Sequence, residues 1–554
     1  MISATQAAPG AALAAPVITD SPPAIDYWLL APMLVVFAAG VLAVLAEAFV
    51  PRPRRRPVQL LLALGGVLAA FVLTLAQAFT LPEGEAGTTL ALGAVAVDRP
   101  ALFLQGTILV LAFISLLLIA ERHGGEDAFA AQAAAVPGSE EEREHVLAGS
   151  EHTEVYPLVL FAVLGMLLFP AANDFLTLFV ALEVMSLPLY LLCGIARRRR
   201  LFSQEAAVKY FLLGAFSSAF FLFGIALVYG YAGSVNFARV DEAVQAGGAE
   251  IFQGGNGEPL LLLGIGLVAV GLLFKVGAVP FHNWKPDVYQ GAPTPITALM
   301  ASCTLVAAFG ALLRVFFTAF GGSVESWRPM LWVVAILTMV VAAIVAVTQR
   351  DIKRLLAYSS VVHAGFVLTA VVAADSAGLA GAMFYLAAYG FTTIGAFAVV
   401  TLVRTHENGA EAGDLEQWAG LGRTSPVLAG ALSLFLLAFA GIPLTSGFIG
   451  KFAVFEAALA AGAAPLVVVG VLSSAVTAFF YVRIIVLMYF SEPAEKGGPR
   501  VVPAGLLTGS VISIGVAATF LLGVYPTPVL DHLIPAPGGG TDAEVAATAD
   551  GFTR

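Results

Sequence analysis

The sequence predicts an all-α integral membrane protein with about 14 transmembrane helices, and three observations support this fold class. Hydrophobic residues make up 59% of the 554 positions and charged residues only 12%. Many apolar runs exceed the roughly 18 residues that indicate a spanning helix. Two of these runs hold a lysine beside helix-breaking residues, since Lys275 precedes Pro280 and Lys451 follows Gly441–Gly447. Charges at bilayer depth are costly and usually functional, and matching broken helices in two halves of a chain indicate an ion site.

The apolar runs place the expected helices in chain order. They lie at roughly 27–50, 58–80, 100–120, 155–173, 175–196, 205–230, 260–282, 294–318, 329–348, 352–374, 377–404, 425–460 (broken), 464–490 and 502–525.

Three longer stretches that lie outside these helices are assigned as tails or a linker. Residues 1–26 are rich in Ala and Pro and lack the basic n-region of a signal peptide, so we expect a disordered external tail. Residues 121–154 hold nine acidic residues against two arginines, which indicates a solvated cytoplasmic linker rather than a cation site. Residues 526–554 are expected to form a second external tail.

An internal repeat follows the three helices of residues 27–120. The segment Phe274–Phe281 is similar to Ala438–Leu444, and a second pair of similar segments precedes these two at comparable distances. Residues 155–318 and 329–490 are therefore expected to form two five-helix units. Because five is an odd number, the second unit is inverted in the membrane relative to the first.

The distribution of loop lysines and arginines predicts the orientation. With the N-terminus outside, the inside loops collect 18 basic residues, Lys285 and Lys353 among them. The outside segments hold only Arg99, Arg239 and Arg328 and, near the C-terminus, Arg554. This bias predicts that both termini lie on the outer side.

Lys275 is the central ionisable residue of the first unit. It lies near the middle of its span, so its side chain cannot easily reach either membrane surface. Burial disfavours the charged form of a lysine, which allows such a group to exchange its proton. The alternative is a lysine that binds backbone carbonyls freed at Pro280. His282 fits two roles, a proton relay or a hydrogen-bonding group at the helix break.

Other ionisable residues also fall within spans. Glu183 needs a proton or a cation, and Lys209 on the next helix is the natural candidate partner, although Lys209 can also extend to the inside surface. His363 fits either a relay or a packing role. Arg314 and Arg483, near helix ends, are interpreted as structural.

The sequence gives no sign of other chemistry. It holds no nucleotide-binding fingerprint and no metal-spaced His/Cys set. Cys193 and Cys303 are too few for an iron–sulfur cluster, which usually needs four thiolates, and are expected to be two lone buried thiols. Basic runs such as Arg52–Arg56 are expected to be positive-inside anchors, so no nucleic-acid partner is predicted.

At these residues the chain resembles the antiporter-like membrane subunits of the bacterial proton-pumping NADH–quinone oxidoreductase, and within them the subunit N family. The resemblance covers about residues 155–490. Six segments carry it: Leu182–Pro188, Lys209–Ser218, Phe274–His282, Pro286–Pro295, Gln349–Ser360 and Gly441–Lys451. The Pro-Asp-Val-Tyr-Gln-Gly-Ala-Pro sequence in Pro286–Pro295 separates subunit N from its sister subunits.

The resemblance implies a site. Glu183 and Lys209 would modulate the central Lys275, and protons would cross a buried axis to an exit lysine, Lys451. His282 and His363 are the candidate histidines of this axis. The resemblance further implies that the chain binds no cofactor or metal, while the whole complex uses FMN, iron–sulfur clusters and quinone. It also implies a bacterial cell-membrane location, with the lipid bilayer, a sister antiporter-like subunit and small quinone-proximal subunits as partners.

Two positions depart from the family. The family usually has a lysine in the eighth span, thirty residues after the central one, and here that residue is Leu305. Leucine cannot carry a proton, so either Ser302, Thr304 and water bridge the gap, or pumping is weak or uses another link. Lys285 stands where the family often has an uncharged residue, and we interpret it as a basic anchor at the inside surface.

Two alternative functions remain at this stage. One is a subunit of an Mrp-type cation/proton antiporter, for which sodium-dependent transport would be the sign. The other is a structural subunit of the oxidoreductase that does not pump protons, for which Leu305 is the sequence hint.

Overall fold

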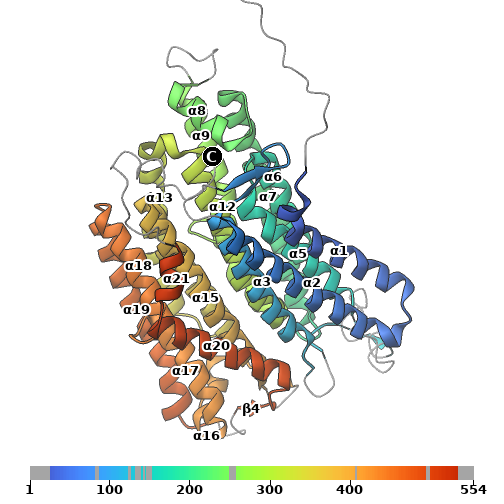
Figure 1. Cartoon of the computed structure of the whole chain (residues 1–554). Coiled ribbons are helices and arrows are strands. Elements are labelled where there is room, and N and C mark those ends of the chain that lie inside the picture. The colour runs from blue at the N-terminus through green and yellow to red at the C-terminus, as the bar shows by residue number, and fades with distance from the viewer. Residues whose placement is uncertain are drawn as a thin grey trace, which may run out of the picture.

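The computed structural model describes residues 25–533 apart from 82–86, 123–126, 131–138, 141–143, 145–151, 249–256, 406–408 and 494–498. The described chain is a bundle of long helices (Figure 1). Twelve of the described helices are long and apolar enough to cross a membrane, and Val155–Ala171 and Pro426–Ala440 are shorter apolar segments. The predicted fold class, an all-α membrane protein, is confirmed.

The helices have these bounds: α1 Tyr27–Phe49, α2 Arg52–Thr80, α3 Arg99–Ala120, α5 Val155–Leu168, α6 Phe175–Cys193, α7 Arg200–Ala232, α8 Phe237–Ala246, α9 Glu258–Val276, α10 Trp284–Gly291, α11 Thr294–Leu299, α12 Leu305–Arg314, α13 Val324–Val347, α14 Ile352–Ala373, α15 Ser376–Leu402, α16 Leu421–Thr424, α17 Pro426–Ala440, α18 Ser446–Ala460, α19 Ala464–Phe490, α20 Leu506–Val524 and α21 Thr527–Leu533. The π-helical segments η3 (Met300–Thr304) and η4 (Val315–Ala319) join α11 and α12 into one continuous span over residues 294–319.

Acidic residues fix where several of these helices begin. The side chains of Asp98, Asp174, Asp351 and Asp375 each accept a hydrogen bond from the first backbone N–H groups of α3, α6, α14 and α15. An N-cap of this kind stabilises a helix by about 1 kcal/mol. These residues therefore mark helix starts that the hydropathy pattern places only approximately.

The helices differ in how deeply they lie in the bundle. The span 294–319, α14 and α15 are almost wholly buried, whereas α1, α2, α7, α19 and α20 are buried along well under half of their apolar windows. Figure 1 shows α15 and α12 between the N-terminal helices and the C-terminal group α17–α20. Polar side chains on the central helices are therefore shielded from lipid by the rest of the chain.

Two helices are broken, one in each of the two units expected from the sequence, residues 155–318 and 329–490. Helix α9 ends at Val276, and the chain continues after a turn as α10. Helix α17 ends at Ala440 and continues as α18. Each first half ends on a glycine in the left-handed region, Gly277 with φ +80° and Gly441 with φ +82°. Such glycine ends leave backbone carbonyls that need new hydrogen-bond donors.

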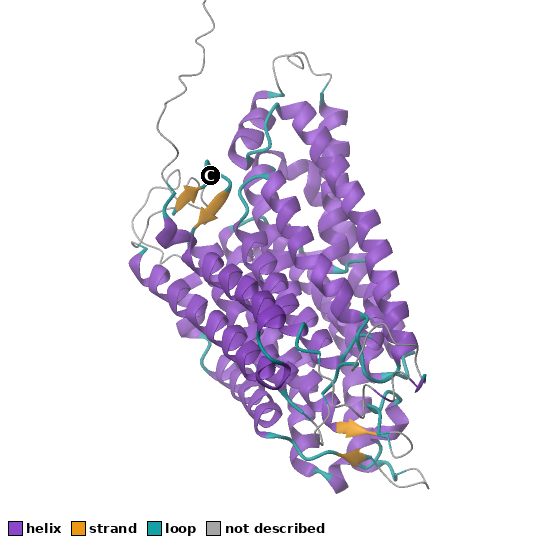
Figure 2. Cartoon of the chain, turned by 90° about the vertical axis from the view of Figure 1, so that its right-hand side faces the viewer, coloured by secondary structure: helices purple, strands orange, loops and turns teal. Residues whose placement is uncertain are grey.

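Two small antiparallel sheets lie at opposite ends of the bundle (Figure 2). One pairs β1 (Thr88–Leu90) with β2 (Val95–Val97), and the other pairs β3 (Val403–Arg404) with β4 (Arg500–Val501). The helix expected at 260–282 ends six residues early, because Gly277 ends it before Pro280. The expected tail at 526–554 begins with a short helix, α21, and its remainder lies outside the described residues, as do residues 1–24 and most of the predicted acidic linker.

Candidate functional site

Lys275 lies in the last turn of α9 and is almost wholly buried, with 3% exposure. Its ammonium group faces aromatic rings, 5.3 Å from the ring centre of Tyr210 and 5.7 Å from that of Tyr190. Trp284 stacks on Tyr210 with ring centres 4.6 Å apart and donates a hydrogen bond to the carbonyl of Phe274. Lys275 is therefore held against π faces, which attract a cation.

The carbonyls freed at the first break are bound by Trp284 and by a different lysine. The Nζ of Lys285 donates to the carbonyl of Val276 at 2.9 Å and to the Ser360 hydroxyl at 2.9 Å. The sequence interpretation of Lys285 as a surface anchor is wrong, because its exposure is only 1%. It was misplaced because the polar run around it is typical of a loop, whereas α10 folds back into the bundle against α7 and α14.

Lys353 was also counted among the surface lysines of the inside loops and is buried, with 5% exposure. Its Nζ donates to the carbonyl of Ala292 at 2.8 Å and to the hydroxyl of Thr294 at 3.2 Å. Lys353 thus stabilises the short connection between α10 and α11.

The predicted pairing of Glu183 with Lys209 is wrong. Glu183 accepts a hydrogen bond from the Ser218 hydroxyl at 2.6 Å. Lys209 instead forms ion pairs with Glu205 at 2.6 Å and with Asp287 at 2.7 Å. Asp287 is the better partner because α10 packs against α7, a contact that sequence spacing does not reveal. The charge of Glu183 still acts on Lys275.

Asp287 is a candidate residue that the sequence interpretation missed. Its second carboxylate oxygen lies 2.6 Å from the guanidinium of Arg354, so one carboxylate on α10 binds cations on α7 and on α14. This cluster connects residues 155–318 to residues 329–490, the two units expected from the sequence.

His363 lies on α14 with 2% exposure. One ring nitrogen is 2.5 Å from the Tyr385 hydroxyl, and the other is 3.3 Å from the Tyr481 hydroxyl. Tyr481 also shares a hydrogen bond with Ser359. A histidine bound to hydroxyl groups on both nitrogens can pass a proton from one side of its ring to the other.

Lys451 lies in α18 and caps the second break. Its Nζ donates to the carbonyls of Phe439 at 2.8 Å and Ala440 at 3.0 Å, and to the Ser474 hydroxyl at 2.7 Å. The side chain is 5% exposed. As predicted from the sequence, a buried lysine follows this broken helix.

His282 lies in the turn between α9 and α10 with 8% exposure. Its ring centre is 6.0 Å from that of Tyr358. Among the described residues its Nδ1 atom has no hydrogen-bond partner, so its placement fits both of the roles that the sequence left open.

Arg314 has a structural partner that sequence reasoning missed. Its guanidinium lies 2.7 Å from Asp98, with both side chains fully buried, and donates to the carbonyl of Pro170 at 2.6 Å. Cys193 and Cys303 are free buried thiols, as expected. Among the described residues no group of three His, Cys, Asp or Glu side chains is arranged to hold a metal ion.

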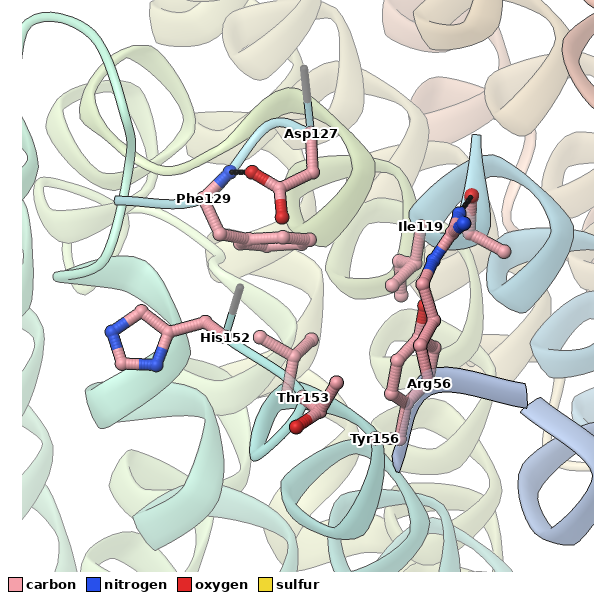
Figure 3. Close-up of a pocket in the computed structure, with 9 residues that line it drawn as sticks. Arg56, Ile119, Asp127, Phe129, His152, Thr153 and Tyr156 are labelled. Carbon is pink, nitrogen blue, oxygen red and sulfur yellow. Dashed lines mark hydrogen bonds between the residues drawn. The ribbon is translucent and has the colours of Figure 1, made fainter. Parts of the chain in front are cut away.

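A small pocket lies apart from these residues, at the ends of α2 and α3 (Figure 3). It is lined by Arg56, Asp127, His152 and Tyr156, among others. Burial raises the pKa of Asp127, while the Phe129 N–H and the charge of Arg197 oppose that shift. None of the predicted site residues lines this pocket.

Comparison with known proteins identifies the family to which this chain belongs. The family described as NADH:quinone oxidoreductase/Mrp antiporter, transmembrane region, matches residues 172–477. The chain belongs to this family. A protein of Thermobifida fusca named NADH-quinone oxidoreductase subunit N is 75% identical over 96% of this chain and 96% of its own length. A protein of the same name from Rhodococcus opacus is 59% identical over 92% of this chain and 95% of its own length.

Solved structures of the family share the fold. A chain of respiratory complex I from Thermus thermophilus with bound aureothin has 32% identity and a TM-score of 0.70, over 92% of this chain and all of that chain. A chain of the Mrp complex from a Dietzia species has a TM-score of 0.75 over 93% of this chain and 98% of that chain, at 22% identity. At that identity the second likeness concerns the fold alone.

Proposed function

We propose that this chain is the proton-translocating subunit N of a bacterial NADH–quinone oxidoreductase. The observation that carries the proposal is a series of buried ionisable groups, Lys275, His363 and Lys451, that spans both broken helices. Each lies within the bundle, where an ionisable side chain is costly to bury and is usually functional. The full-length similarity to proteins named subunit N supports the same assignment.

In the proposed path, Lys275 is the central proton carrier and Lys451 the exit carrier. Glu183 is the carboxylate whose charge acts on Lys275. His363 passes protons between the tyrosine hydroxyl groups on its two sides. His282 stands at the first break as a further candidate relay.

Lys209 acts on this path through Asp287 rather than through Glu183. When Asp287 holds both Lys209 and Arg354, α10 is fixed to α7 and α14. A rearrangement of these ion pairs would move α10 and Trp284, and with them the rings around Lys275. This gives a physical route by which a change elsewhere in the complex reaches the central lysine.

The chain works as part of a larger assembly. We expect FMN, iron–sulfur clusters and quinone to be bound by the complex as a whole. The apolar faces of α1, α2, α19 and α20, which are largely exposed in the isolated chain, would contact lipid, a sister antiporter-like subunit and small quinone-proximal subunits. Without the buried Lys285 and Lys353, the inside loops still hold far more basic residues than the outside segments, so both termini are proposed to lie outside.

The alternative is a subunit of an Mrp-type cation/proton antiporter, because the description of the matching family names both kinds of protein. Two experiments separate the functions. Purification of a tagged chain in mild detergent should recover NADH-oxidising and quinone-site subunits, whereas recovery of other antiporter-like subunits alone would overturn the assignment. In the assembled complex, Lys275→Ala should lower proton pumping while assembly is retained. Unchanged pumping would favour a structural subunit, as Leu305 suggests.

A further inference from the structure

Lys285 is a buried lysine at the first helix break, and the proposed path assigns it no role. It donates to the Val276 carbonyl and to the Ser360 hydroxyl, each at 2.9 Å. Its ammonium group also lies 5.8 Å from the ring centre of Tyr289. A lysine that is 1% exposed in a membrane bundle is a functional candidate by default.

The surroundings of Lys285 at the first break match those of Lys451 at the second. Each lysine follows a broken helix and binds the last carbonyls of its first half, Val276 for Lys285 and Ala440 for Lys451. Each stem packs on the glycine that ends that half. A Cβ atom added to Gly277 would lie 2.6 Å from Cδ of Lys285, and one added to Gly441 would lie 2.9 Å from Cδ of Lys451.

Lys285 is also connected to His363. Its hydrogen-bond partner Ser360 lies three residues before His363 on α14, and residues at that spacing share a helix face. The Ser360 hydroxyl also interacts with Tyr289 and Tyr389, and the Tyr389 ring centre is 4.7 Å from that of His363. The charges of Lys285 and Lys451 both act on His363.

The buried span between the two breaks holds no acidic residue, lysine or histidine that could carry a proton in place of Lys285. Residues 294–319 contain no Asp, Glu, Lys or His, and Leu305 is buried there with 3% exposure. Ser302 donates back to the carbonyl of Ala298 in its own helix. Arg314 is held by Asp98, and arginine does not give up its proton in proteins.

We propose that Lys285 carries protons between Lys275 and His363. On the Lys275 side, Trp284, the residue before Lys285, stacks on the Tyr210 ring that faces Lys275. The inference rests on the proposed function of the chain. In each transfer one N–H bond breaks and one forms, with hydroxyl groups or water between the nitrogens. The proton passes between the ammonium of one lysine and the free amine of the other, and then between Lys285 and the His363 imidazole. No oxidant, reductant or further reactant is needed.

The competing role for Lys285 is that of a structural cap for the Val276 carbonyl. Lys353 provides a matched control, because it is also a buried lysine that binds one carbonyl and one hydroxyl at a helix junction. Lys285→Gln separates the two roles, since glutamine can donate to the carbonyl but cannot release a proton at neutral pH.

The test uses the whole complex in proteoliposomes and measures quinone reduction and protons translocated per electron. We expect Lys285→Met and Lys285→Gln to lower both the turnover and the proton yield. The turnover should fall by at least about tenfold, since a positioned proton-transfer group contributes a factor of about 100 or more. Lys353→Met should keep the normal proton yield once assembled. If Lys285→Met fails to assemble, Lys285→Gln, which keeps a donor for the cap, decides the question.

A normal proton yield and turnover in Lys285→Gln would overturn the inference and leave Lys285 a cap. Lys275→Ala is measured beside it to keep the two proposals apart. If Lys275→Ala lowers pumping while Lys285→Gln does not, only the role of Lys285 is lost. If both variants pump normally, the proposed function itself fails.

Discussion

The buried ion pair of Arg314 and Asp98 gives a prediction about stability that is independent of proton transfer. Both side chains are fully buried and lie 2.7 Å apart. Removing one member of such a pair leaves an uncompensated charge in the interior and costs about 3–5 kcal/mol. Asp98→Asn should therefore destabilise the chain by about that amount, a large part of a total stability of roughly 5–15 kcal/mol.

A second substitution separates the charge from the helix cap. Asp98 also accepts a hydrogen bond from the backbone N–H of Ala101 at the start of α3. Asparagine keeps this cap and alanine does not, so Asp98→Ala should cost about 1 kcal/mol more than Asp98→Asn. The double variant Asp98→Asn/Arg314→Met removes both charges and should recover most of the loss.

The measurement is the free energy of unfolding of the purified chain, taken from its loss of helical signal on titration with a denaturing detergent in mixed micelles. Abundance of the assembled complex in membranes gives a second readout. A double variant no more stable than Asp98→Asn would refute the reasoning, because it would show that loss of the charge opposite Arg314 is not the source of the destabilisation. So would an Asp98→Asn variant as stable as the parent chain.

Three further predictions concern the proposed path and its supports. Lys451→Met should lower the proton yield per electron of the complex in proteoliposomes while leaving its assembly on native gels unchanged; a normal yield would exclude Lys451 as the exit carrier. Asp287→Asn should slow quinone reduction, and adding Lys209→Met should cause little further loss, because the first change already breaks the pair; additive losses would show that the two residues act separately. Gly277→Ala should destabilise the chain by at least about 1–2 kcal/mol, the cost of a left-handed non-glycine residue, because the added Cβ would also lie 2.6 Å from Cδ of Lys285. Gly266→Ala, where an added Cβ meets nothing within 4 Å, should not destabilise it; equal stability of the two variants would contradict the requirement for glycine at the break.

The sequence predicted the helices and the broken spans because both depend on local composition. Apolar runs locate spans at single-helix resolution, and the Gly-Pro pattern beside Lys451 marks a break that the structure contains. The burial of Lys275 and His363 was predictable for the same reason, since each lies within an apolar run.

The partners of these residues were not predictable, because they come from distant parts of the chain. Lys209 pairs with Asp287, which is 78 residues away, rather than with the acidic residue on the preceding helix. Arg314 pairs with Asp98 across 216 residues. Lys285 was misplaced because hydropathy cannot distinguish a polar loop from a short re-entering helix. Only the structure shows that Lys285 donates a hydrogen bond to the Val276 carbonyl, a contact that holds the buried side chain.

The three buried lysines of the proposed path differ in what holds their charge. Lys285 and Lys451 each donate hydrogen bonds to backbone carbonyls at a helix break. Lys275 is faced by the rings of Tyr190 and Tyr210 and depends on the charge of Glu183. Loss of the Glu183 charge would therefore alter the free energy of protonation of Lys275 more than that of Lys285 or Lys451. This makes Lys275 the point in the proposed path at which an electrostatic signal can drive proton transfer.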